Sequence, residues 1–114
     1  MSDAAADLLP GTLELLVLKA LSLTPMHGWG IAQRIDQLSG EVFRVQQGSL
    51  YPALQRMLRR GWVRSEWRVT EHNRRARYYL ITPAGRRRLE AETVNWERTS
   101  AAVNGILRVR LVDL

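Results

Sequence analysis

The stretch Gln46–Trp62, QQGSLYPALQRMLRRGW, combines residues that interrupt helices with apolar residues at helical spacing. Gly48 and Pro52 are the interrupting residues, yet leucine and methionine recur around them at intervals of three and four. If Ser49 is the N-cap, Pro52 falls in the first turn, where a backbone N–H has no partner within the helix. The sequence therefore predicts a helix that begins at Ser49 and tolerates its proline.

The end and the faces of this helix can be predicted from the same stretch. Gly61 follows two arginines, a combination typical of a helix C-terminus, where glycine turns the chain and cations suit the negative end of the dipole. We therefore expect the helix to end at Arg60. The residues expected to point inward are Leu50, Leu54, Met57 and Leu58. Those expected to point outward are Ser49, Tyr51, Gln55, Arg56 and Arg59.

Two further helices are expected before this stretch. The first has Thr12 as its N-cap, carries apolar residues on more than one side, and stops at Thr24-Pro25. The second is short, centred on Ile31–Leu38, and ends at Ser39-Gly40. A brief extended segment at Val42–Val45 leads into the third helix.

After the third helix the periodicity changes from helical to alternating. Residues 63–69 alternate, residues 76–82 are rich in aromatic and branched side chains, and the polar segment between them carries Arg74 and Arg75. We expect a two-stranded hairpin with a basic tip. Thr82-Pro83 then begins a last helix as N-cap and first helical residue. Its apolar stripe, with Thr93 and Ser100 between, is Leu89, Trp96, Val103 and Leu107.

Charge is distributed unevenly along the 114 residues. The net charge is +6, but residues 44–88 hold twelve arginines and two glutamates, a balance of +10, against −4 for the remainder. A basic middle segment rich in arginine suits a polyanionic partner such as DNA. A solvated basic face is the alternative for charge taken alone. There is no cysteine, the N-terminus does not resemble a signal peptide, and no apolar run reaches membrane-spanning length, so we expect a soluble cytoplasmic protein.

Candidate catalytic and metal-binding residues are few. His27 and His72 lack the spacing of a metal-binding pair, and His27 is more simply explained as part of a turn. Ser49 has no histidine near it in sequence, so capping explains it better than nucleophilic catalysis. The glycines match no phosphate-binding loop. We expect neither an enzyme nor a protein with a metal or another cofactor.

The order of elements predicts an α+β fold, a winged helix-turn-helix formed by three helices and a two-stranded wing. Residues 9–82 are expected to form this DNA-binding domain, and residues 83–114 one long C-terminal dimerisation helix. The outward face of the third helix would then enter the major groove, and the wing tip would contact a minor groove or its phosphates. A winged-helix module for protein–protein contact is the alternative, although it would favour a mixed or apolar outward face.

Three stretches resemble one family closely. They are LLPGTLELLVLKALSLTPMHGWGIAQRI, VQQGSLYPALQRMLRRGWVRSEW and NRRARYYLITPAGRRRLEAE, and together they cover most of the chain. They are similar to the PadR family of bacterial winged-helix transcriptional regulators, in the smaller architecture with a single C-terminal helix. The resemblance implies a homodimeric repressor on a near-palindromic operator of double-stranded DNA, released by a small-molecule effector.

Individual residues carry this resemblance further. The resemblance implies that Ser49 and Tyr51 contact phosphates. It also implies that Gln55 and Arg56 lie on the flank of the helix that reads bases, and that Arg74 and Arg75 form the basic tip of the wing. Trp29 departs from the family, in which tyrosine is commoner, and this puts a phosphate contact there in doubt. Leu80 stands where a polar residue is commoner.

The remaining expectations concern the dimer and its effector. The residues expected at the dimer interface are Leu15, Leu18, Leu89, Trp96, Val103 and Leu107. Two interpretations of Trp96 stay open: it packs the interface, or two symmetry-related rings flank a gap that binds a small planar aromatic effector. The resemblance implies the second, because some small members of the family hold planar, often cationic, compounds at the dimer centre.

Overall fold

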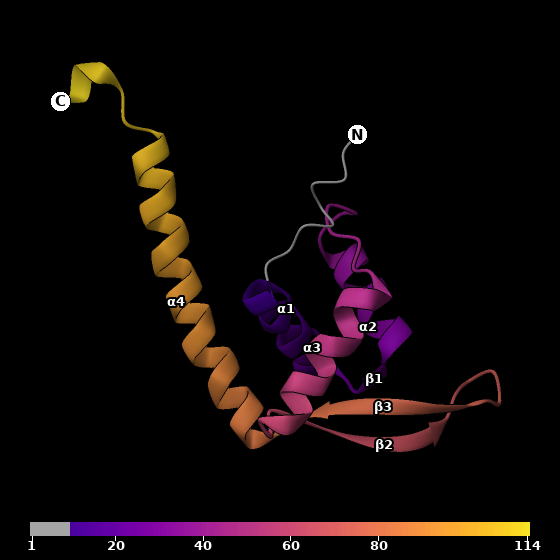
Figure 1. Ribbon diagram of the computed structural model, residues 1–114. Coiled ribbons are helices and arrows are strands. Elements are labelled where there is room, and N and C mark those ends of the chain that lie inside the picture. Colours follow the sequence, from indigo (N-terminus) through magenta and orange to yellow (C-terminus); the bar gives the residue numbers. More distant parts are fainter. Residues whose placement is uncertain (1–9) are drawn as a thin grey trace.

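The computed structural model describes residues 10–114 as four helices, a small sheet and one 3₁₀ turn (Figure 1). The helices are α1 (Pro10–Leu23), α2 (Gly28–Leu38), α3 (Gln47–Arg59) and α4 (Pro83–Leu107), followed by the 3₁₀ turn Leu111–Asp113. The strands are β1 (Met26–His27), β2 (Val63–Val69) and β3 (Arg75–Ile81). This arrangement confirms the predicted α+β winged helix with a long C-terminal helix. The first nine residues lie outside the described part of the chain.

The core lies where α1, α2 and α3 meet the base of the sheet. Each helix contributes an apolar face, although Leu38 at the end of α2 is exposed, and the side chains between the three helices are almost completely excluded from solvent. The buried residues of largest volume are Leu18, Leu21, Ile31, Leu50, Leu54, Met57 and Val17. Tyr79 and Val63 close the core from the side of the sheet, so the wing is anchored at its base.

The sheet has three antiparallel strands in the order β1-β3-β2, and the expectation of a purely two-stranded wing was incomplete. β2 and β3 form the predicted hairpin, with Val63 opposite Ile81 and Val69 opposite Arg75. The additional strand pairs Met26 with Tyr79 and His27 with Tyr78. A two-residue strand is too short to show alternation, and so the sequence pattern could not reveal it.

The third helix begins two residues earlier than predicted. Gln46 is the N-cap, and its carbonyl accepts hydrogen bonds from the N–H groups of Ser49 (3.0 Å) and Leu50 (2.9 Å). The expectation that Ser49 caps the helix was therefore wrong, because Ser49 lies inside the first turn. Pro52 consequently sits within the helix body, where it supplies no N–H to the carbonyl of the exposed Gly48.

The end of α3 agrees with the prediction. Arg60 is the C-cap and Gly61 adopts a left-handed conformation with φ of 75°, which favours glycine. The N–H of Trp62 donates to the carbonyl of Met57 (3.0 Å), and that of Gly61 donates to Leu58 (3.1 Å). This pair of bonds is a Schellman motif, and it turns the chain directly from α3 into the wing.

The boundaries of the first two helices agree in part with expectation. α1 ends at Leu23, before Thr24-Pro25, and α2 ends with Ser39 as its C-cap, as predicted. Thr12 is not an N-cap, because α1 already includes Pro10. The segment 42–46 is irregular and forms no strand.

α4 starts at a tightly packed junction and then leaves the body of the protein (Figure 1). Thr82 caps it as predicted, accepting a hydrogen bond from the N–H of Gly85 (3.0 Å), while Thr82 Oγ1 also donates to the carbonyl of Gly61 (2.6 Å). Gly85 is buried because the carbonyl of Trp62 lies directly against it. From Thr93 onward nearly every residue of the helix is exposed.

Candidate nucleic-acid interface

The outer face of α3 presents polar and aromatic side chains from a rigid helix. Leu50, Ala53, Leu54 and Met57 are all buried and fix the rotation of the helix about its axis. In this orientation, four of the five residues predicted to point outward are exposed, namely Ser49, Tyr51, Gln55 and Arg59. An exposed helical face of this composition can reach both base edges and phosphates.

The side chain of Arg56 does not project outward, and that expectation was wrong. Its guanidinium turns toward α1, where Nε lies 2.8 Å from Oε2 of Glu14. Arg60 approaches the same carboxylate, with Nη1 3.5 Å from Oε1. Helical periodicity placed Arg56 at the edge of the outward face, but it could not show that α1 carries a buried acid opposite it.

Tyr51 is held over the start of α2. Its ring and hydroxyl lie so close to Gly28 that a Cβ there would be 3.1 Å from the phenol oxygen. His27 caps α2 by accepting a hydrogen bond at Nδ1 from the N–H of Gly30 (3.1 Å), as its expected turn role suggested. The exposed Trp29 stacks near His27, with ring centroids 6.3 Å apart. The beginnings of α2 and α3 therefore form one surface.

The wing tip has a defined loop conformation that presents Arg74. Thr70 closes the loop, because its Oγ1 accepts from the N–H groups of His72 and Arg74 (both 3.3 Å). Asn73 takes the left-handed conformation, with φ of 59°, that the tight turn needs. Arg75 is the first residue of β3 and pairs with Val69, so its side chain projects from the sheet, whereas Arg74 belongs to the loop.

A groove of about 770 Å³ separates the wing from the starts of α2 and α3. It is lined by aromatic and basic side chains, chiefly Trp29, Tyr51, Trp67, Arg74, Arg75 and Arg77. The guanidinium of Arg75 lies 5.1 Å from the centre of the Trp67 ring, a cation–π distance that restrains its position. From the sequence, neither Trp67 nor Arg77 was identified as a residue of this site. The hairpin register, which places these two residues opposite each other, is the signal that could have found them.

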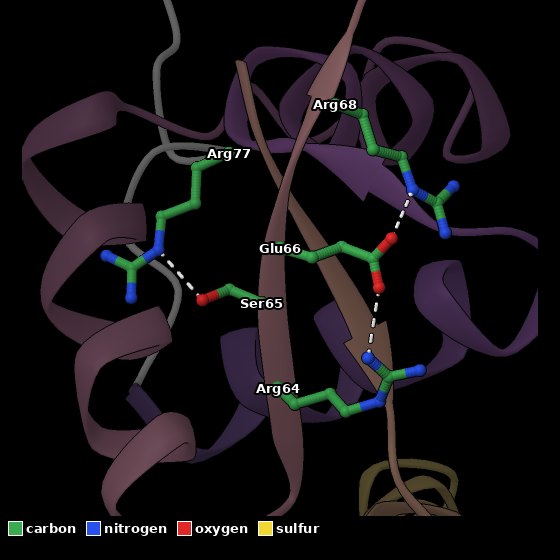
Figure 2. Close-up of polar contacts among 5 residues, drawn as sticks. All are labelled: Arg64, Ser65, Glu66, Arg68 and Arg77. Carbon is green, nitrogen blue, oxygen red and sulfur yellow. Dashed lines mark hydrogen bonds and ion pairs between the residues drawn. The ribbon is translucent and has the colours of Figure 1, made fainter. Parts of the chain in front are cut away.

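The two faces of the wing differ in how their arginines are neutralised. Figure 2 shows Glu66 between Arg64 and Arg68, with hydrogen bonds of 3.0 and 2.8 Å. The bond from Arg68, followed by that from Arg64, holds the pKa of the Glu66 carboxyl below its usual value. On the other face Arg77 donates to the hydroxyl of Ser65 (2.8 Å), a contact that leaves its charge in place. The groove face is therefore the more positive one.

The residues expected at the dimer interface divide into two groups. Leu18 is 1% exposed and packs in the core of its own subunit, so its expected availability to a partner was wrong. Leu89 is partly buried against the same core. Trp96, Val103 and Leu107 are 50%, 48% and 75% exposed on α4. Leu15 and Trp96 both line a shallow groove of about 270 Å³ between α1 and α4.

A helix-turn-helix beside a basic wing defines a winged-helix protein, and comparison with known families agrees. The model of the transcriptional regulator PadR-like family matches residues 17–91, which include α2, α3 and the wing. The chain belongs to this family and is a transcriptional regulator. DNA binding is what that membership implies.

Individual relatives support the assignment. The chain is 41% identical over 90 residues to an uncharacterised 37.1 kDa protein in a transposon of Streptomyces fradiae, a match that covers 79% of this chain and 24% of that protein. It is 38% identical over 80 residues to a transcriptional regulator of Mycobacterium tuberculosis, covering 70% of this chain and 71% of the relative. The solved PadR-like transcriptional regulator of Bacillus cereus has a TM-score of 0.77 at 26% identity, covering 88% of this chain and 95% of that one.

The family and its structural neighbours are transcriptional regulators and not enzymes, as expected. Over residues 10–114, no helix has the length and apolar character needed to cross a membrane.

Proposed function

We propose that the protein is a cytoplasmic repressor that binds a near-palindromic DNA operator as a homodimer. The observation that carries the proposal is the continuous surface formed by the outer face of α3, the groove and the arginine face of the wing. A rigid helix with exposed Tyr51 and Gln55 has the shape and chemistry to enter a major groove. A repressor of this kind blocks transcription where its operator overlaps a promoter.

The residues on this surface have different proposed roles. Gln55 lies mid-helix and exposed, and its amide can form a bidentate contact with adenine in the major groove. Ser49 and Tyr51 lie in the first turns of α3, and Arg59 lies at its end; these three contact phosphates. Arg74 and Arg75 contact phosphates beside the minor groove. Such contacts set the register and the general affinity, whereas Gln55 contributes to specificity.

The first experiment measures how binding of a selected operator depends on salt. The wild-type protein is expected to bind duplex DNA more weakly as salt rises, because arginines displace counterions from phosphates. Arg74→Ala and Arg75→Ala should each reduce the slope of log affinity against log salt concentration by about 1.8, because the homodimer loses two phosphate contacts worth about 0.9 each. Arg98→Ala, which removes an exposed arginine from α4, is the control and should leave the slope unchanged. Failure to bind any duplex at low salt would exclude the proposed function.

The proposed dimer interface is formed by α4 with a contribution from the first turns of α1. The seam residues Trp96, Val103 and Leu107 are between 48% and 75% exposed and follow a heptad-like spacing, which suits a second helix. Leu15 lies beside the same seam. A two-fold axis through α4 would present two copies of α3 to successive major grooves, about 34–36 Å apart.

We place the effector site of this proposal at Trp96. The ring is half exposed, and the groove it lines contains small polar side chains beside it, including Asn95 and Thr99. Two such rings near a two-fold axis could hold a flat aromatic or cationic compound between them. An effector would release the operator only if it favours a spacing of the two α3 helices different from the DNA-bound one.

Titration of planar aromatic cations against tryptophan fluorescence tests the role of Trp96. We expect saturable quenching in the wild type and its loss in Trp96→Phe, because the quenched ring would be absent. Trp29→Phe, Trp62→Phe and Trp67→Phe are matched controls that should keep the response. Quenching that persists unchanged in Trp96→Phe, or no binding across a broad panel of compounds, would leave Trp96 as a packing residue.

A further inference from the structure

The carboxylate of Glu14 faces α3 from the buried side of α1. Glu14 is 8% exposed, the one charged or polar residue among those classed as buried between residues 10 and 114. Its two oxygens each face one arginine: Arg56, in the C-terminal half of α3, lies 2.8 Å away, and Arg60, the C-cap of α3, lies 3.5 Å away. The acid therefore neutralises charge on the helix that is proposed to bind DNA.

Stability alone does not account for this acid. A buried ion pair contributes little net stability, because both charges lose solvation, and an apolar pair of similar volume is often as stable or more so. The neighbouring positions on α1 are apolar and buried, including Leu13, Val17 and Leu18. An acid at this position has instead a consequence for recognition, since Arg56 directly follows the exposed Gln55.

The side chain of Arg56 is restrained but not sealed in the interior. It is 30% exposed, and that of Arg60 is 52% exposed, whereas the Glu14 side chain is 10% exposed. Glu14 itself cannot follow the arginines into solvent without leaving the core. If the carboxylate lost its charge, the two long guanidinium side chains would be free to swing toward the solvent side of α3.

We propose that Glu14 limits the sequence-independent DNA affinity of the protein, because it holds Arg56, and with it Arg60, back from DNA phosphates. This inference rests on the proposed function. A free arginine beside Gln55 would add phosphate contacts that are the same on every sequence, which raises non-specific affinity without improving discrimination. By retaining these two arginines, Glu14 leaves Ser49, Tyr51 and Arg59 as the phosphate contacts of α3 beside the base contact of Gln55.

The decisive variant is Glu14→Gln in the full chain, because glutamine keeps the shape and removes the charge. Its affinity is measured for the selected operator and for a scrambled duplex of equal length, across a range of salt concentrations. The expected result is tighter binding to the scrambled duplex, with a log–log salt slope steeper by about 0.9 for each arginine that reaches a phosphate. Because the homodimer carries two copies of Arg56, their release corresponds to about a sixtyfold gain at 0.1 M salt relative to 1 M. Affinity for the operator should rise by about the same factor, because the added phosphate contacts are equal on every sequence.

Two controls separate release of Arg56 from other effects. Glu90→Gln removes a charge of the same sign from an exposed position on α4 and reports the general effect of net charge. In the double variant Glu14→Gln/Arg56→Ala, the gain should be reduced to what Arg60 alone can supply. A purely structural role for Glu14 predicts the opposite sign, with weaker binding and lower thermal stability.

The proposal is overturned if folded Glu14→Gln binds scrambled DNA no more tightly than Glu90→Gln. A second test does not depend on the folding of Glu14→Gln. Arg56→Ala alone should leave the salt slope of the wild type unchanged, whereas Arg74→Ala reduces it. If Arg56→Ala reduces the slope equally, Arg56 already contacts DNA and Glu14 does not hold it back. Absence of any duplex binding by the wild type would instead remove the proposed function on which this inference depends.

Discussion

Replacing Gly85 with alanine is expected to destabilise the protein by about 1–3 kcal/mol or more, the range for overpacking at a site that cannot relax. A Cβ at this position would collide with the backbone carbonyl of Trp62 and would lie 2.8 Å from Cγ1 of Ile81. The carbonyl cannot move away easily, because it also accepts a hydrogen bond from the N–H of Thr82 (3.0 Å). Denaturant unfolding followed by circular dichroism measures the change.

Gly105→Ala is the matched control for this prediction. It is the same substitution in the same helix, but nothing lies within 4 Å of the added Cβ. Alanine should therefore stabilise the protein by about 0.5–1 kcal/mol through helix propensity. Equal effects of the two substitutions would show that the junction at Gly85 is not tightly packed in solution.

The double variant Val103→Glu/Leu107→Glu is expected to convert the proposed dimer into folded monomers. Full burial of such a side chain contributes about 1.5–3 kcal/mol, and the dimer would lose the still exposed part of this for four side chains, so that association weakens about a hundredfold. The monomer should keep its fold, since the two residues are 48% and 75% exposed in the single chain. Sedimentation velocity across a range of protein concentrations measures the association.

Ala101→Glu is the control, because position 101 is exposed and lies on the side of α4 away from the seam. It should leave association unchanged. If the double variant sediments like the wild type at every concentration, the dimer does not use this seam.

Much of the fold could be predicted because its helix and strand boundaries are marked by local residues. Gly61 requires a left-handed turn, and Thr82-Pro83 can cap and begin a helix without reference to the rest of the chain. These signals placed the end of α3, the wing and the start of α4. Ser49 shows the limit of such signals, because a residue able to cap a helix need not do so when the chain enters the helical turn earlier.

The differences between the predicted and the observed site arise from contacts between segments that are distant in sequence. Arg56 and Glu14 are 42 positions apart, and periodicity cannot show which buried acid a partly exposed arginine will meet. Leu18 was expected on a free side of α1, but α1 is covered by α2, α3 and α4 together. The position of Trp67 depends on which face of the hairpin turns toward α3, which only the assembled fold determines.

The junction of Gly85 with Trp62 has a mechanical consequence for the whole molecule. α4 contains 25 residues and is therefore about 37 Å long at 1.5 Å per residue. Because its first turn is pressed against the backbone that joins α3 to the wing, the helix has no loose hinge at this end. If α4 tilts as a rigid rod by about 5° at the junction, its far end moves by about 3 Å. A displacement of the far end of α4 would therefore rotate α3 and the wing together by a small angle.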